Sequence, residues 1–191
     1  MNKFNQKNLL KKIKNGDESS FGKVYDFYVD KIYQFVFLKV NHKENAQEIV
    51  QDVFWKFWQY VHKPEAQINN ISSLLYTIAR NLVFDFYRSQ GRDARVTIPI
   101  ESQDMIDSLV QDNSLEKEAE IDIKYDIEAV QKALEILPDS YQDIIVLKYI
   151  NELSNKEIGI ILNKKEGAVR VNCHRALLAL KQAIKKQDLD R

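Results

Sequence analysis

Residues 153–181, LSNKEIGIILNKKEGAVRVNCHRALLALK, decide how the C-terminal part of this chain folds. Ser154 followed by Glu157 is a capping box, because each side chain accepts a hydrogen bond from a free backbone N–H at the start of a helix. Asn163 stands where the chain has to turn sharply, and asparagine tolerates a left-handed backbone better than most residues. A second helix restarts near Lys165, so this stretch predicts a helix-turn-helix.

The second of these helices has two faces. Its inward stripe is apolar at helical spacing and comprises Val169, Cys173, Ala176, Leu177 and Leu180. Its outward face carries Arg170, Val171, His174 and Arg175. Arginine on an exposed helix suits the major groove of DNA, where it bonds guanine edges or phosphates. The alternative is an ordinary helical hairpin with a solvated charged face.

The composition predicts an all-α fold. Five glycines and three prolines in 191 residues are too few for a protein rich in tight β turns, and 45% apolar composition supports packed cores. No apolar run approaches the roughly 18 residues of a membrane span, and the N-terminus lacks a signal-peptide core. The single cysteine, Cys173, excludes an internal disulfide and fits a reducing compartment. We therefore expect a cytoplasmic protein without stable membrane insertion.

Charge is balanced in total but unevenly distributed. The formal net charge is zero, whereas proteins that grip DNA unaided usually carry excess positive charge, so this chain is expected to need a partner that holds it on DNA. Residues 93–126 carry ten acidic side chains against three basic ones and show no sustained hydrophobic period, which is typical of a flexible linker. The chain therefore divides into two small helical domains at 1–92 and 123–183, an acidic linker at 93–122 and a tail at 184–191.

Residues 46–61 predict a helix with a core face and a polar face. A step of about 100° per residue places on the core side Ala46, Ile49, Val50, Val53, Phe57, Tyr60 and Val61. The polar side carries Glu48, Gln51, Asp52, Trp55 and Gln59. An exposed tryptophan among carboxylates and amides is typical of a protein–protein interface. The alternative is that Trp55 packs on a neighbouring helix of the same domain.

Residues 72–92 predict a second two-faced helix. Its core stripe comprises Leu75, Ile78, Ala79, Leu82 and Phe86. The side chains that face elsewhere are Arg80, Phe84, Tyr87 and Arg88, with Asn81 at the flank. Basic side chains interleaved with aromatic ones suit single-stranded nucleic acid, because they hold phosphates and stack bases. The loop before the helix contains Asn69 and Asn70 and could accept a base swung out of its stack. The alternative is aromatic packing against the helices of residues 21–40.

Taken in order, these segments resemble a bacterial sigma factor of the small extracytoplasmic-function (ECF) type. The motifs are EIVQDVFWKFW, LLYTIARNLVFDFYR and LPDSYQDIIVLKYINELSNKEIGIILNKKEGAVRVNCHRAL, and the match covers nearly all of residues 20–182. The resemblance implies a promoter-recognition subunit whose partners are core RNA polymerase, promoter DNA and an anti-sigma factor, which can hold the protein at the membrane. It implies no cofactor, no metal and no catalytic residue. It also implies that the free protein is compact, with its binding surfaces covered by itself or by that partner.

Residue by residue, the resemblance implies three binding surfaces. The polymerase clamp would bind Glu48, Gln51, Asp52, Trp55 and Gln59. The minus-ten element would be read and opened by Asn69, Asn70, Arg80, Asn81, Phe84 and Arg88. The minus-thirty-five element would be read by Arg170, Val171, His174 and Arg175, with phosphates held by Lys164 and Lys165.

Two other classes of protein stay open. A conventional regulator would bind duplex DNA through the C-terminal domain alone, and a gel shift without polymerase would reveal it. An α-helical enzyme is disfavoured, since His42, His62 and His174 lie far apart and no cluster of histidine, cysteine and acid has ligand spacing. Glu48 and Asp52 have the spacing of a metal pair on a helix, but a solvated helix face explains them.

Overall fold

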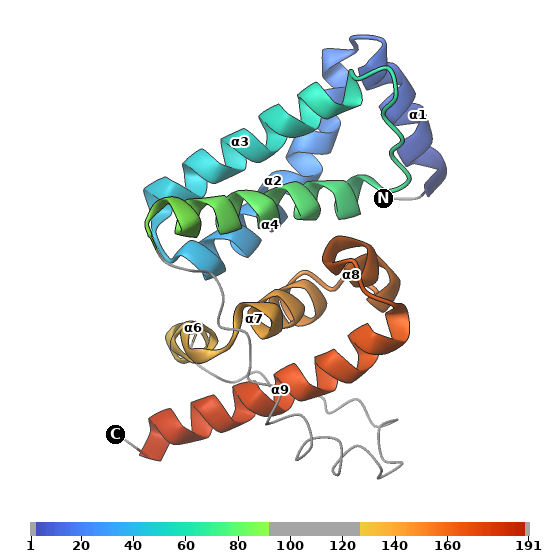
Figure 1. Cartoon of the computed structure of the whole chain (residues 1–191). Coiled ribbons are helices and arrows are strands. Elements are labelled where there is room, and N and C mark those ends of the chain that lie inside the picture. Colours follow the sequence, from blue (N-terminus) through green and yellow to red (C-terminus); the bar gives the residue numbers. More distant parts are fainter. Residues whose placement is uncertain (1–2, 92–126, 190–191) are drawn as a thin grey trace.

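The computed structural model describes residues 3–91 and 127–189, and within these ranges every regular element is helical. The N-terminal bundle consists of α1 (Lys3–Lys14), α2 (Glu18–Val40), α3 (Lys43–Val61) and α4 (Ile71–Ser89). The C-terminal bundle consists of α6 (Ile127–Ile136), α7 (Asp139–Ile145), the π-helical turn η2 (Val146–Ile150), α8 (Asn155–Leu162) and α9 (Glu166–Leu189). Figure 1 shows the two bundles stacked on each other, and the predicted all-α class is confirmed. The linker predicted at 93–122 lies outside the described residues.

Short polar side chains fix where the helices of the N-terminal bundle begin. Asp17 caps α2 by accepting from the backbone N–H of Ser20 at 3.3 Å and from its hydroxyl at 2.8 Å. The Asn70 side chain caps α4 in the same way, accepting from the N–H of Ser73 at 3.0 Å. α2 ends at Asn41, whose φ of 47° is in the left-handed region that asparagine tolerates. Local chemistry therefore defines where α2 begins and ends and where α4 begins.

The predicted helix-turn-helix is confirmed. Ser154 and Glu157 form the capping box at the start of α8, and Asn163 ends α8 with a left-handed φ of 52°. The turn is tight enough that a Cβ atom on Gly159 would lie 2.7 Å from the carbonyl oxygen of Lys164. Only glycine avoids this clash with backbone, so Gly159 sets how closely the turn folds back on α8.

α9 agrees with its predicted inward stripe but is longer than predicted. The whole predicted stripe is buried, namely Val169, Cys173, Ala176, Leu177 and Leu180. The helix then continues to Leu189, and Ile184 is also buried in the core. The folded part therefore extends past the predicted boundary at residue 183, because another apolar side chain follows at helical spacing.

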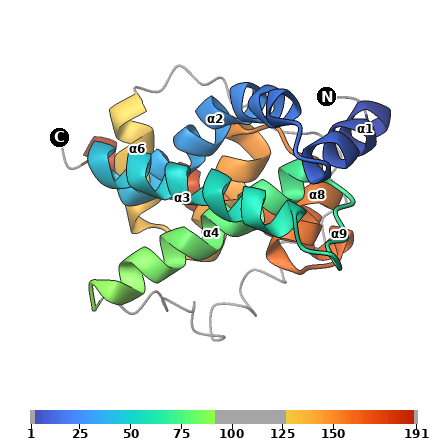
Figure 2. The ribbon, with the colours of Figure 1, turned by 90° about the horizontal axis from the view of Figure 1, so that it is seen from above.

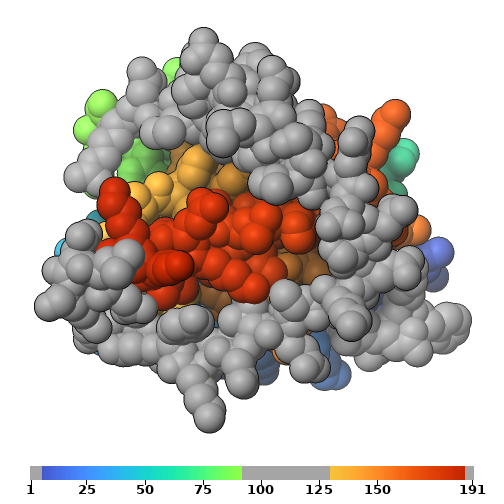
Figure 3. Space-filling view, turned by 90° about the horizontal axis from the view of Figure 1, so that it is seen from below, coloured from blue at the N-terminus to red at the C-terminus, as the bar shows by residue number. Residues whose placement is uncertain are grey.

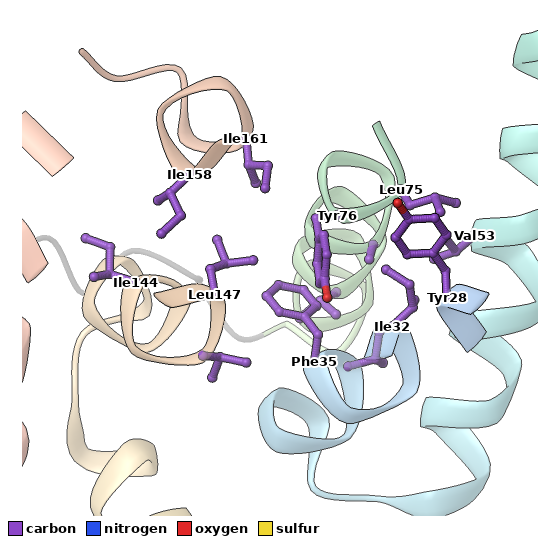
Figure 4. Close-up of a cluster of buried hydrophobic side chains, with 14 of the residues drawn as sticks. Tyr28, Ile32, Phe35, Val53, Leu75, Tyr76, Ile144, Leu147, Ile158 and Ile161 are labelled. Atoms are coloured by element: carbon purple, nitrogen blue, oxygen red, sulfur yellow. The ribbon is translucent and has the colours of Figure 1, made fainter. Parts of the chain in front are cut away.

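One apolar core runs through both bundles. Figure 4 shows Leu147 of η2 pointing towards Phe35 of α2 and Tyr76 of α4, and all three side chains are buried. Burying a side chain of this size stabilises a fold by about 1.5–3 kcal/mol. Seen from above, the N-terminal bundle lies over the C-terminal one, with the start of α4 next to α8 (Figure 2). Apolar packing therefore joins the bundles as well as the helices within each of them.

The predicted core stripe of α4 is only partly correct. Leu75 and Ala79 are buried as predicted, while the other three members are half-buried, namely Ile78, Leu82 and Phe86. Other side chains of α4 are buried in addition, among them Ile71, Tyr76 and Val83. The reason is that α4 packs on α2 and α3 from one side and on α8 from another. A single stripe allows for only one of these neighbours.

Candidate polymerase and nucleic-acid interfaces

The polar face of α3 is open to solvent. All the residues predicted to bind polymerase are exposed on it, namely Glu48, Gln51, Asp52, Trp55 and Gln59. Trp55 is 59% exposed, so the alternative that it packs on a neighbouring helix is wrong. The opposite face is buried as predicted, except that Tyr60 is half-buried and Phe54 joins the core. A rigid helix thus presents a large aromatic ring among carboxylates and amides, which is the composition of an interface anchor.

The two asparagines of the predicted minus-ten loop differ in accessibility. Asn69 is exposed. Asn70 is half-buried and uses both ends of its side chain, because its Oδ1 atom caps α4 and its Nδ2 atom donates to Oε1 of Glu157 at 3.2 Å. The other oxygen of Glu157 belongs to the capping box of α8. A base can therefore reach the amide of Asn69, while the amide of Asn70 is occupied by the C-terminal bundle.

Arg80 of α4 is bonded to the C-terminal bundle. Its Nε atom donates to Oδ2 of Asp143 at 2.7 Å, and Nζ of Lys39 donates to Oδ1 of the same carboxylate. The side chains of Asp143 and Lys39 are 2% and 5% exposed, whereas that of Arg80 is 41% exposed. The hydroxyl of Tyr87 donates to the backbone carbonyl of Lys39 and braces this end of α2. Two cations of the N-terminal bundle therefore share one buried carboxylate of α7.

The remaining predicted minus-ten residues on α4 are exposed, namely Asn81, Phe84 and Arg88. The ring of Phe84 is 43% exposed and lines a small cavity at the junction together with Arg80 and Tyr87. The alternative of aromatic packing against residues 21–40 holds for Tyr87, which bonds to α2, but not for Phe84. α4 thus combines one accessible aromatic ring with two arginines.

α9 lies on the far side of the C-terminal bundle from the N-terminal bundle (Figure 1). Figure 3 shows α9 in red across the face seen from below, with other helices of the C-terminal bundle beside it. The exposed members of its predicted DNA surface are Lys164, Lys165, Arg170 and His174, and the half-buried ones are Val171 and Arg175. The helix packs on α6, α7 and α8, so its inner side is anchored to its own bundle.

The titratable side chains of the described residues do not form a metal site. Within residues 3–91 and 127–189, no three histidine, cysteine or carboxylate side chains gather as metal ligands would. Burial raises the pKa of the Cys173 thiol, so this side chain stays protonated near neutral pH and packs as a small apolar group. Burial, assisted by the nearby Glu157, also raises the pKa of Tyr28 to about 12. None of the helices in these two ranges has the length and apolar character of a membrane span.

Comparison with known proteins agrees with this geometry. Residues 24–93 match the family described as Sigma-70 region 2, and residues 127–180 match the family described as Sigma-70, region 4. Over 183 residues the chain is 36% identical to the ECF RNA polymerase sigma factor SigW of Bacillus subtilis strain 168, an overlap that covers 94% of this chain and 96% of that protein. The chain belongs to the ECF family of RNA polymerase sigma factors. As a sigma factor, it directs RNA polymerase to promoter DNA at transcription initiation.

Two solved structures share the fold of this sigma factor. CnrH, solved in complex with the cytosolic domain of CnrY, matches with a TM-score of 0.66 over 93% of this chain and 96% of that chain, at 18% identity. The sigma factor RpoE of Bartonella quintana, solved in complex with the anti-sigma factor NepR, matches with a TM-score of 0.63 over 86% of this chain and 96% of that chain, at 22% identity. The helical architecture is therefore common to all three chains.

Two residues of the junction were not singled out from the sequence, namely Lys39 and Asp143. A signal for both exists in their spacing. Lys39 lies one turn after the buried Phe35, and Asp143 lies one turn before the buried Leu147, so each shares a buried helix face. A charged side chain at a buried position requires a partner. The spacing alone does not say which residue that partner is.

Proposed function

We propose that this sigma factor binds core RNA polymerase through α3 and reads two promoter elements through separate domains. Residues 1–92 form the domain for polymerase and the minus-ten element and residues 93–122 form the acidic linker. The domain for the minus-thirty-five element begins at residue 123 and includes α9 to its end at Leu189. The observation that carries the proposal is the placement of Trp55, whose exposed ring lies on a polar helix face separate from the basic faces of α4 and α9. Polymerase and DNA can then bind different surfaces of one molecule at once.

The α3 face suits a protein partner. Trp55 provides a large apolar area with few rotatable bonds, and such residues contribute most of the binding energy at protein interfaces. The surrounding polar residues, Glu48, Gln51, Asp52 and Gln59, form a rim that can accept hydrogen bonds and complement a basic partner surface. We assign this face to the clamp of the polymerase.

The α4 face suits an unpaired DNA strand. The exposed ring of Phe84 can stack on a base, an interaction that contributes about 1–3 kcal/mol per base in single-strand binding proteins. Arg80 and Arg88 supply charge for the strand backbone. The exposed amides of Asn69 and Asn81 offer donors and acceptors to base edges that are accessible only after the duplex opens, and the Nδ2 group of Asn70 would join them once its bond to Glu157 is broken.

The α9 face suits the major groove of duplex DNA. Arg170 and His174 are exposed on α9, and Val171 and Arg175 on the same outward face are half-buried. Lys164 and Lys165 precede the start of α9, where backbone N–H groups also attract phosphates. The lysines would position the helix, and the side chains on α9 would read bases.

The net charge of the whole chain is zero, so the chain alone is expected to hold promoter DNA only weakly. Polymerase would fix the separation of the domains, so that two weak contacts act together through effective concentration. By analogy with the complex of RpoE and NepR, an anti-sigma factor would hold the protein inactive in the cytoplasm or at the membrane. The role is that of a specificity subunit with no catalytic residue of its own.

A reconstituted transcription assay tests this proposal. The purified chain is combined with core RNA polymerase on genomic fragments, and run-off products are compared with those of core polymerase alone. We expect fragment-specific products only when both proteins are present. A parallel gel shift without polymerase is expected to show weak binding that depends little on sequence. Nanomolar, sequence-selective binding of duplex DNA by the chain alone would instead identify a conventional regulator.

A further inference from the structure

The junction between the bundles contains a two-cation site that is filled by one carboxylate. Nζ of Lys39 bonds to Oδ1 of Asp143, and Nε of Arg80 bonds to Oδ2 at 2.7 Å. The carboxylate and Lys39 are buried, whereas Arg80 lies at the open edge. Each oxygen of the carboxylate thus has its own cation, an arrangement that makes strong charge-assisted hydrogen bonds. Both cations come from the N-terminal bundle, and the anion comes from the C-terminal bundle.

Two other side-chain contacts at the junction also have their donor in the N-terminal bundle and their acceptor in the C-terminal bundle. Asn70 donates to Glu157 at 3.2 Å, and Asn41 donates to Glu135 at 2.7 Å. In each case a carboxylate of the C-terminal bundle accepts from a side chain of the N-terminal bundle. A further contact, from Asn151 to a backbone carbonyl of α2, involves no charged group. Two residues of the proposed minus-ten surface, Asn70 and Arg80, are therefore bonded to carboxylates of the C-terminal bundle.

A DNA phosphodiester could bind the same two cations as the Asp143 carboxylate. Like a carboxylate, it spreads one negative charge over two oxygens, so that two cations can each bind one of them. Arg80 is reachable from solvent, and Lys39 would become so once Asp143 leaves. The exposed ring of Phe84 lines the same cavity as both cations, so a base next to that phosphate can stack on it. The site therefore suits the backbone of an unpaired strand.

We propose that Lys39 and Arg80 form a phosphate site for the minus-ten strand and that Asp143 fills this site when the bundles are closed. The inference rests on the proposed function of α4. Closure and strand binding exclude each other, because one pair of cations cannot hold both anions. Core polymerase, by setting the distance between the bundles, withdraws Asp143 and frees the site.

Asp143 is the residue through which this equilibrium can be shifted. In the closed molecule an uncharged residue 143 leaves Lys39 buried without a counter-ion, which is strongly unfavourable. In the open molecule Lys39 is hydrated and does not need that partner. Asp143→Asn keeps the shape of the side chain and removes only its charge, so it destabilises the closed state and shifts the population towards open molecules.

Small-angle X-ray scattering and DNA binding by the full chain test the proposal together. The DNA probe is a fluorescently labelled single-stranded oligonucleotide of mixed sequence, since a phosphate contact does not depend on sequence. We expect Asp143→Asn to increase the radius of gyration and to strengthen binding by about tenfold or more. The matched control is Asp139→Asn, which changes net charge equally at the same cavity but removes neither ion pair. We expect the control to leave compactness unchanged and affinity within about twofold.

A second substitution separates the phosphate site from the opening of the molecule. In the Asp143→Asn background, Lys39→Gln is expected to weaken binding several-fold and to reduce the slope of log affinity against log salt by about 0.7, the loss of one phosphate contact to a single strand. Arg80→Gln in that background is expected to do the same, and circular dichroism verifies that each variant is folded. If Lys39 and Arg80 only stabilised the fold, their replacement would leave the slope of log affinity against log salt unchanged.

Three results would overturn the proposal. One is an unchanged radius of gyration in Asp143→Asn, another is an equal gain of affinity in Asp139→Asn, and the third is a salt slope that Lys39→Gln does not alter. Failure of the proposed function would appear elsewhere, as the absence of run-off transcription by the unmodified chain with core polymerase.

Discussion

The two helices assigned to promoter DNA are in opposite states within one structure. α4 directs part of its DNA surface towards the C-terminal bundle, where Arg80 bonds to Asp143 and Asn70 bonds to Glu157. α9 lies on the side of the C-terminal bundle away from the N-terminal bundle (Figures 1 and 3), and its Arg170 side chain is exposed. The junction of the bundles therefore covers part of the proposed minus-ten surface and does not involve the exposed side chains proposed for the minus-thirty-five element. The polar face of α3, which carries Trp55, is also exposed, as the Arg170 side of α9 is.

The difference has a simple physical basis. α9 buries its apolar stripe within its own bundle by packing on α6, α7 and α8, and Arg170 and His174 on its polar side are exposed. α4 packs on its own bundle and on α8, and its polar side chains near the second contact must find partners there. The carboxylates of the C-terminal bundle provide those partners. Coverage of α4 thus follows from apolar packing at the junction, and the ion pairs add selectivity to it.

The largest expected effect comes from weakening the apolar packing that joins the two bundles. Leu147→Ala removes a fully buried side chain from the core shared by the bundles, so we expect the free energy of unfolding to fall by about 2–5 kcal/mol. Urea denaturation measures the loss. The control is Leu178→Ala, which truncates a leucine that is exposed on α9 and is expected to cost less than about 1 kcal/mol. Equal losses in the two variants would mean that the shared core does not hold the bundles together.

A somewhat smaller effect is expected on the open α3 face. Trp55→Ala is expected to weaken binding to core polymerase by about 2 kcal/mol or more, roughly 30-fold, because an exposed tryptophan ringed by polar groups is an interface anchor. Titration of labelled chain with core polymerase measures it. The matched control is Phe27→Ala, which removes an exposed aromatic ring from α2. Because α3 is open in the closed molecule, the loss should be the same in the Asp143→Asn background, and a difference would contradict the comparison.

The open α9 face provides the next test. Arg170→Ala is expected to reduce discrimination between minus-thirty-five sequences by about 1–3 kcal/mol, because one arginine contact with a base is lost. Competition between promoter variants in holoenzyme binding measures the effect, and the affinity for core polymerase should not change. Lys181→Ala serves as the control, since it removes an exposed charge farther along the same helix. Unchanged selectivity in Arg170→Ala would remove that residue from the reading surface.

The smallest expected effect concerns the start of α8. Ser154→Ala removes one half of the capping box and is expected to lower the free energy of unfolding by about 1 kcal/mol. Thermal denaturation followed by circular dichroism measures it. Ser19→Ala, at an exposed position near the start of α2, should change stability by no more than about 0.5 kcal/mol. Because Glu157 also bonds to Asn70, a loss well above 1 kcal/mol would show that the cap and the junction are coupled.

Much of the candidate site was predictable from the sequence where a single helix decides it. The polar face of α3 and the inward stripe of α9 depend only on spacing within each helix, and both were predicted correctly apart from Phe54 and Tyr60. The stripe of α4 was predicted less well, because its burial depends on a second neighbour that is distant in the sequence. Tyr76 is buried there, although a one-sided stripe does not include it.

The sequence by itself determined where helices begin and end and which of their faces are apolar. The physical reason is range: the capping box of Ser154 and the left-handed turn at Asn163 join groups only a few residues apart. Only the tertiary structure decided that Asp143 meets Lys39 and Arg80, which are 104 and 63 residues away in the chain. A charged residue at a buried position predicts that a partner exists, but only the packing of the bundles brings that partner within hydrogen-bond distance.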